Sequence, residues 1–128
     1  MKPLEITSSM RTLSGIFYPK GYAFVMFPTA TGAQQVASQH TEQAMLLTPE
    51  QVLWDVGQVK DDSDVELPPV GTEGATVRKF IDLARKGHHA VMVKVDSDEE
   101  TERLMVAARA ASFSYGQRYH LLAMEDLE

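Results

Sequence analysis

The stretch Tyr22-Ala-Phe-Val-Met-Phe27 decides the fold of this chain. Side chains of an extended strand point alternately to its two faces, so Tyr22, Phe24 and Met26 share one face and the residues between them share the other. Both sets are apolar, which is typical of a strand in the interior of a sheet. We therefore expect a central strand over residues 22–27 that ends at Pro28.

A second stretch of the same kind lies late in the chain. In residues 89–95, the valines at 91, 93 and 95 share one face, and Ala90, Met92 and the stem of Lys94 share the other. The sequence therefore predicts two strands that are buried on both faces.

Helix signals divide the rest of the chain. Capping-box spacing, in which side chains satisfy free backbone groups of the first helical turn, occurs at Thr31 with Gln34, at Thr48 with Gln51 and at Ser97 with Glu100. The expected elements are a strand over 22–27, a helix from Thr31, an edge strand over 44–47, a helix from Thr48 to about Gly57, a helix over 75–86 that Gly87 ends, a strand over 89–95, a helix from Ser97 to about Ser112, a turn at 114–116 and a strand over 118–124.

This order predicts a single domain over 1–128 of the α+β class, with the ferredoxin-like split βαβ pattern. The antiparallel sheet would carry its helices on one face, with an extra helix in the central connection. Residues 1–20 would form an N-terminal arm, and the acidic, Pro-rich residues 60–72 would form a solvated loop.

Such a sheet leaves large apolar side chains on its second face. Exposed patches of this kind usually mark an interface. We expect a second copy of the chain to cover this open face and form a homodimer, and the alternative is that the N-terminal arm covers it.

Composition excludes several classes of protein. The chain has no cysteine, which excludes a disulfide scaffold, a thiolate zinc site and a cysteine nucleophile. The net charge of -6 argues against a sequence-independent nucleic-acid binder. The longest apolar run, Tyr22 to Pro28, is too short to span a membrane, and residues 1–10 lack the apolar core of a signal peptide. We expect a cytoplasmic protein that makes no membrane contact.

A family resemblance rests on Phe80-Ile-Asp-Leu-Ala-Arg-Lys-Gly-His-His-Ala-Val-Met-Val-Lys-Val95. This helix with a basic end, glycine and apolar strand leads into the acidic cap at 97–100, a long helix, a turn of small residues and Tyr119. Over residues 75–125 the arrangement resembles small bacterial general-stress and heat-induced-stress proteins, and residues 21–47 are compatible with their first half. The resemblance implies an α+β sandwich and a non-enzymatic or unassigned role. The loop over 60–72 departs from that pattern.

Two groups of side chains are candidates for binding. Five residues could line a ligand pocket on the open sheet face: Tyr22, Phe24, Met92, Tyr119 and His120. Four residues of one helix form a basic cluster that could receive an anion or an acidic partner segment, such as residues 61–66 of a neighbour, or could be an ordinary solvated face: Arg78, Lys79, Arg85 and Lys86.

Other chemistry has weaker signals. His40, His88, His89 and His120 lack metal-ligand spacing, and residues 61–66 lack the glycine and distal glutamate of a calcium loop. Asp82 lies between Arg78 and Arg85, which is typical of surface ion pairs rather than of a catalytic acid. We therefore expect no metal, no cofactor and no catalytic residue.

The leading interpretation is a small, non-enzymatic regulatory or protein-interaction protein associated with stress. The alternative is a dimeric α+β barrel enzyme, or a small-molecule binder, that uses the open sheet face. A third interpretation, RNA binding, rests on the first-strand aromatics Tyr22, Phe24 and Phe27.

Overall fold

The computed structural model describes residues 17–40, 44–57, 72–120 and 123–128. Within these ranges its elements are, in chain order, β1 (Tyr22–Phe27), α1 (Ala30–Ser38), β2 (Ala44–Leu47), α2 (Pro49–Gln51), the π-helical turn η2 (Val52–Val56), α3 (Thr72–Arg85), β3 (His89–Lys94), α4 (Asp98–Ala110), β4 (Tyr115–Tyr119) and β5 (Met124–Asp126). The predicted segment over 60–72 falls almost entirely outside the described residues, as does most of the predicted arm over 1–20.

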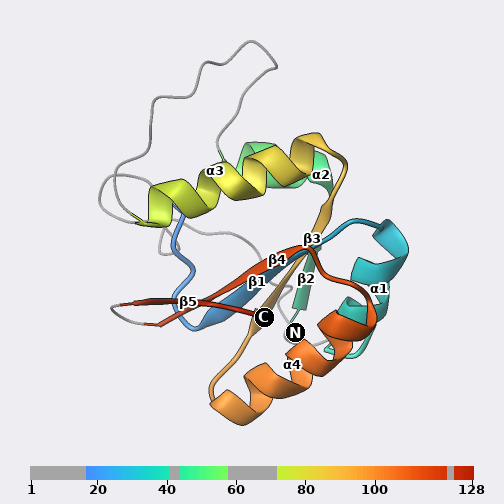
Figure 1. Cartoon of the computed structure of the whole chain (residues 1–128), viewed down its shortest axis with the longest axis vertical. Helices are drawn as coiled ribbons and strands as arrows, with labels where there is room; N and C mark the ends of the chain where they lie inside the picture. The colour runs from blue at the N-terminus through green and yellow to red at the C-terminus, as the bar shows by residue number, and fades with distance from the viewer. Residues whose placement is uncertain (1–16, 41–43, 58–71, 121–122) are drawn as a thin grey trace.

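The strands form one antiparallel sheet in the order β2-β3-β1-β4-β5 (Figure 1). β1 lies between β3 and β4, with Phe24 opposite Met92 on one side and opposite Gln117 on the other. The α+β class and the antiparallel sheet are confirmed. So is the central position of the two strands that are apolar on both faces.

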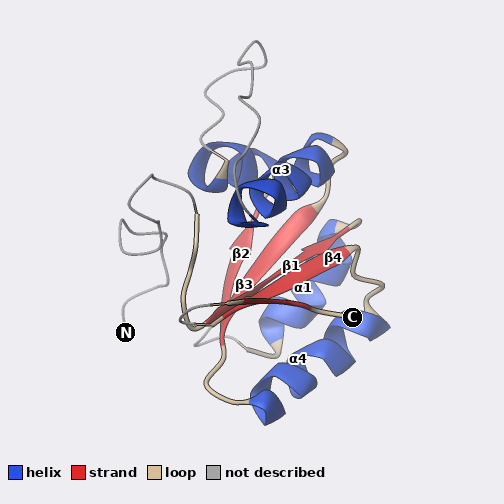
Figure 2. Ribbon diagram, turned by 60° about the vertical axis from the view of Figure 1, so that its left-hand side comes forward, coloured by secondary structure: helices blue, strands red, loops and turns tan. Residues whose placement is uncertain are grey.

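α1 and α4 cover one face of this sheet (Figure 2). The core on this side joins Ala23, Val25 and Phe27 of β1 to the valines of β3 and to apolar residues of both helices. The helices approach closely, since Gly32 of α1 lies where a β-carbon would come within 3.1 Å of the carbonyl oxygen of Ala111.

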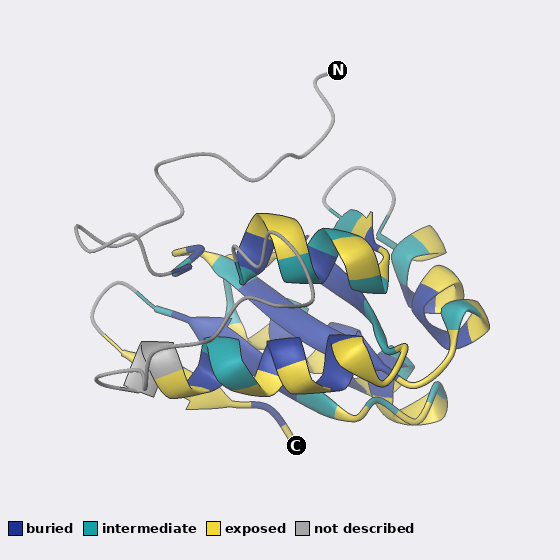
Figure 3. Cartoon of the chain, turned by 90° about the horizontal axis from the view of Figure 1, so that it is seen from above, coloured by how far each residue is buried: buried dark blue, intermediate teal, exposed yellow. Residues whose placement is uncertain are grey.

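α2, η2 and α3 cover the opposite face, so the prediction that the helices lie on one face is wrong. Phe80, Leu83 and Ala84 of α3 pack with Phe24 and Met26, and Phe17 fills space beside them. The cause is that α3 has its own apolar stripe, and packing it against the sheet buries both surfaces within one chain. The sheet is therefore a buried middle layer between two helical layers (Figure 3).

η2 and α3 pack tightly against each other. A β-carbon at Gly57 would lie 2.6 Å from a side-chain carbon of Ile81, so a larger residue there would force Ile81 to shift. The prediction that helix α3 ends at Gly87 is confirmed. Gly87 has a φ of 91° and its N–H donates to the carbonyl of Ala84 at 2.9 Å.

The last part of the sheet differs from the expectation. The fourth strand begins at Tyr115, inside the segment predicted as a turn, and a short fifth strand follows it. The predicted strand began at Arg118. In the structure the polar Gln117 and Arg118 both lie inside β4 and are buried. Asp126 and Asp98 accept hydrogen bonds from these two side chains, which makes their burial tolerable.

Candidate functional site

The predicted pocket residues lie together, but inside the protein. Tyr22, Phe24, Met92 and Tyr119 belong to, or pack against, the core between the sheet and α3. Of these, only Tyr22 keeps appreciable exposure. His120 lies apart from that core, and its Nε2 is 2.9 Å from a carboxylate oxygen of Glu125.

Aromatic rings fill the space in which a ligand would have to sit. The ring of Phe80 lies 4.4 Å from that of Phe24, measured between centroids, and Phe17 packs edge-on at 5.4 Å from Phe24. Tyr18 packs edge-on against Tyr119 at 4.9 Å. These contacts make the face a packed core, so the predicted pocket would require helix α3 to move.

The hydroxyl of Tyr119 is a polar group inside this apolar core. The Tyr119 side chain is buried, and its hydroxyl makes no hydrogen bond to the residues that the structure describes. Burial, with the neighbouring phenols of Tyr115 and Tyr18, raises the pKa of Tyr119 well above its usual value, so the group stays neutral. A neutral phenol without a partner offers no acid–base chemistry near pH 7.

One sequence signal was missed. Residues 20–27, Lys-Gly-Tyr-Ala-Phe-Val-Met-Phe, fit at every position the pattern of the strand on which RNA-recognition motifs stack bases. In the structure Phe27 lies on the α1–α4 side, away from Tyr22 and Phe24, and Phe80 packs on Phe24. The strand therefore presents no open stacking platform in this arrangement.

The basic cluster lies on the outer surface of α3. Lys79, Arg85 and Lys86 are exposed and Arg78 is partly exposed, whereas Thr76, Phe80 and the other inward residues are buried. Lys79 reaches over the ring of Tyr115, with its Nζ 5.7 Å from the ring centroid. Over residues 75–86 this surface carries a single acidic side chain, Asp82.

Trp54 is a surface residue that the sequence analysis did not single out. It is 60% exposed on η2, the segment that packs against α3. The signal was available, because Val52 and Val56 define the inner side of this helical segment and Trp54 falls halfway between them, on the outer side.

The described histidines and carboxylates do not converge on a reaction centre. His88 Nδ1 lies 2.8 Å from the hydroxyl of Ser114, and His120 is paired with Glu125. Within the described ranges, no group of three His, Asp or Glu side chains could hold a metal ion. The acidic residues 61–66 lie outside those ranges.

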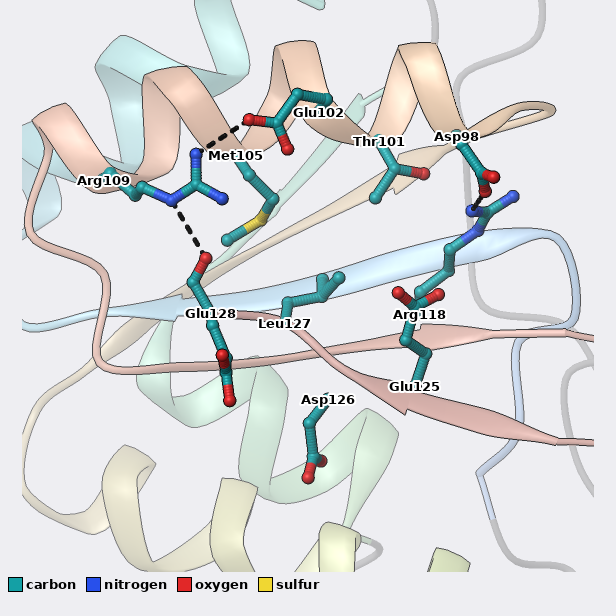
Figure 4. A pocket seen from close by; sticks show the side chains of 10 residues that line it. All are labelled: Asp98, Thr101, Glu102, Met105, Arg109, Arg118, Glu125, Asp126, Leu127 and Glu128. Atoms are coloured by element: carbon teal, nitrogen blue, oxygen red, sulfur yellow. Dashed lines mark hydrogen bonds and ion pairs between the residues drawn. The ribbon is translucent and has the colours of Figure 1, made fainter.

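A groove of about 460 Å³ lies between α4 and the C-terminal residues (Figure 4). Its lining includes two ion pairs: Arg118 with Asp98 at 2.6 Å, and Arg109 with Glu102 at 3.0 Å. Arg109 also donates to the backbone oxygen of Glu128 at 2.9 Å. The bond to Glu128 joins the C-terminal residues to α4, and the pair of Arg118 with Asp98 joins β4 to α4, so these groups have structural roles.

Comparisons with family models, curated proteins and solved structures found no match to this chain. No helix in the described part of the chain is long and apolar enough to cross a lipid bilayer.

Proposed function

We propose that this chain is a non-enzymatic interaction protein that binds an acidic segment of a partner protein on the outer surface of η2 and α3. The observation that carries the proposal is the combination of the exposed Trp54 with the basic outer surface of α3. Tryptophan is enriched among the residues that dominate binding energy at interfaces.

Charge supports an acidic partner. The whole chain has a net charge of -6, whereas residues 75–86 carry four cations and one carboxylate. A local field of this sign attracts acidic segments and repels basic ones. An apolar side chain in the partner segment would give Trp54 a contact that excludes water.

Three finer proposals accompany this function. The sheet order β2-β3-β1-β4, with α1 and α4 on one face, supports a ferredoxin-like sandwich to which α2, η2, α3 and β5 are added. The resemblance of residues 75–125 supports a bacterial, stress-associated, cytoplasmic role, which a rise in abundance after heat treatment would test. The homodimer stays a prediction, which light scattering would test. The sheet face through which we expected it to form is covered by α3.

The test is binding of a fluorescent peptide that is rich in Asp and Glu and contains leucine. Lys79→Glu with Lys86→Glu reverses two exposed cations that make no ion pair in the part of the chain that the structure describes. We expect this double variant, and Trp54→Ala alone, each to weaken binding about tenfold or more, measured by fluorescence anisotropy.

Lys20→Glu is the matched control, because Lys20 is exposed and lies outside α3. It should bind the peptide like the unmodified chain. Equal weakening by Lys20→Glu, or unchanged binding by the double variant, would contradict the proposal. A doubled mass without peptide, lost in the double variant, would identify a second copy as the occupant instead of a different protein.

A further inference from the structure

A small recess opens where the end of α1, the end of β3 and the first turns of α4 meet. Its volume is about 230 Å³, and its polar lining consists of Gln39, His40, Lys94, Glu100 and Arg103. We refer to it as the His40 recess. It lies on the side of the sheet that α1 and α4 cover, so it is separate from the proposed interaction surface on α3.

Two cations, Lys94 and Arg103, are among the residues that line the His40 recess. Lys94 and Arg103 are both exposed, and neither makes an ion pair within the described ranges. The carboxylate in the recess, that of Glu100, already accepts a hydrogen bond from the N–H of Asp96 at 2.8 Å and helps to cap α4. Within the part of the chain that the structure describes, the recess is therefore lined by two cations without ion pairs and one carboxylate that is already hydrogen-bonded.

His40 adds a neutral donor. Burial, together with the nearby Arg103, lowers the pKa of His40 below its ordinary value of 6.5. Its imidazole is therefore uncharged near pH 7 and has one ring N–H to donate. The amide of Gln39 is a further donor in the lining.

We propose that the His40 recess binds a phosphate group, or an oxyanion of similar charge, carried by a small soluble molecule. Arg103 can present two parallel N–H donors to such an anion, and Lys94 lines the same recess at the end of β3. The donors come from three elements around a concave space, which suits a compact anion better than a flat membrane surface. Binding would be a ligand response separate from the partner contact proposed above.

The test is a titration of the full chain with inorganic phosphate at constant ionic strength, followed by NMR of the histidine rings. A bound anion favours the protonated imidazole, so we expect phosphate to raise the pKa of His40 in a saturable manner. His88 is the internal control, because its pKa is lowered by burial and by Lys86 at a different place in the fold. Its pKa should not respond.

Arg103→Gln should weaken phosphate binding about tenfold or more. Arg109→Gln is the matched control on the same helix, since Arg109 pairs with Glu102 outside the recess. The proposal is overturned by an unresponsive His40, or by equal weakening in the two variants. Binding to phosphatidylglycerol vesicles that depends on Arg103, without a response to free phosphate, would overturn the small-molecule form of the proposal.

Discussion

Tyr18 and Tyr119 pack against each other, but of their two hydroxyls only that of Tyr18 makes a hydrogen bond within the described residues. Tyr18 donates its hydroxyl hydrogen to the carbonyl of His120 at 2.9 Å. Tyr119, against which it packs, has a buried hydroxyl that makes no such bond. A buried hydroxyl that has lost its hydrogen bonds to water destabilises the folded state by about 1–3 kcal/mol relative to a satisfied one.

Removing each hydroxyl should therefore have opposite consequences. Tyr119→Phe keeps the ring contacts and removes the unsatisfied group, so we expect the free energy of unfolding to stay the same or to rise by about 1 kcal/mol. Tyr18→Phe, the matched control, should lower it by about 1 kcal/mol. Urea unfolding measures both. A clear loss of stability in Tyr119→Phe would mean that its hydroxyl has a partner in solution.

In helix α1, the residue that caps the N-terminus differs from the one that the sequence predicts. The sequence predicts a cap at Thr31, because Gln34 lies three residues later. In the structure Thr29 is the cap, and its side chain accepts from the N–H of Gly32 at 3.0 Å. The residue three positions after Thr29 is Gly32 rather than Glu or Gln, so the capping-box spacing selected the wrong threonine. Pro28 ends β1 directly before Thr29, which leaves Thr29 extended and Thr31 inside the helix.

This difference is measurable. Thr29→Ala removes the capping oxygen and should lower the free energy of unfolding by about 1 kcal/mol. Thr31→Ala replaces an exposed residue within the helix by a better helix former, so we expect no loss. Thermal and urea unfolding of the two single variants decide between the caps. A larger loss in Thr31→Ala than in Thr29→Ala would restore the prediction made from the sequence.

Across the whole molecule, the sequence could predict those strands and helices that short stretches of residues determine by themselves. The strand over residues 22–27 and the stripe of α3 follow from local apolar patterns, and both are observed. The face to which α3 packs depends on tertiary contacts such as Phe24 with Phe80, which no local pattern contains. For the same reason the aromatic residues of β1 suggested a pocket, and the sequence could not show that Phe80 fills it. The His40 recess joins residues from three elements, so spacing could not reveal it.

The folded chain as a whole should lose stability on mild acidification. Burial is the larger cause that lowers the pKa of both His40 and His88 below 6.5, with Arg103 and Lys86 contributing respectively. Below pH 6.5 the unfolded chain therefore binds more protons at these sites than the folded chain, and the free energy of unfolding falls as pH falls toward the folded values.

We expect the urea midpoint to be lower at about pH 5.5 than at about pH 7.5. The double variant His40→Gln, His88→Gln should show a smaller difference between the two values. A midpoint that is equal at both pH values in the unmodified chain would contradict the lowered pKa values.

The central position of β1 also sets the order in which the chain can fold. Tyr22 pairs with Lys94 and Ala23 pairs with Arg118, so both neighbours of this strand are synthesised long after it. Until they emerge from the ribosome, a segment that is apolar on both faces has no partner. Pairing across such distances in sequence is slow, because the entropy of loop closure is lost before any contact compensates for it. The contact that decides the architecture therefore forms late, and the nascent chain exposes an apolar, aggregation-prone strand until β3 and β4 have been synthesised.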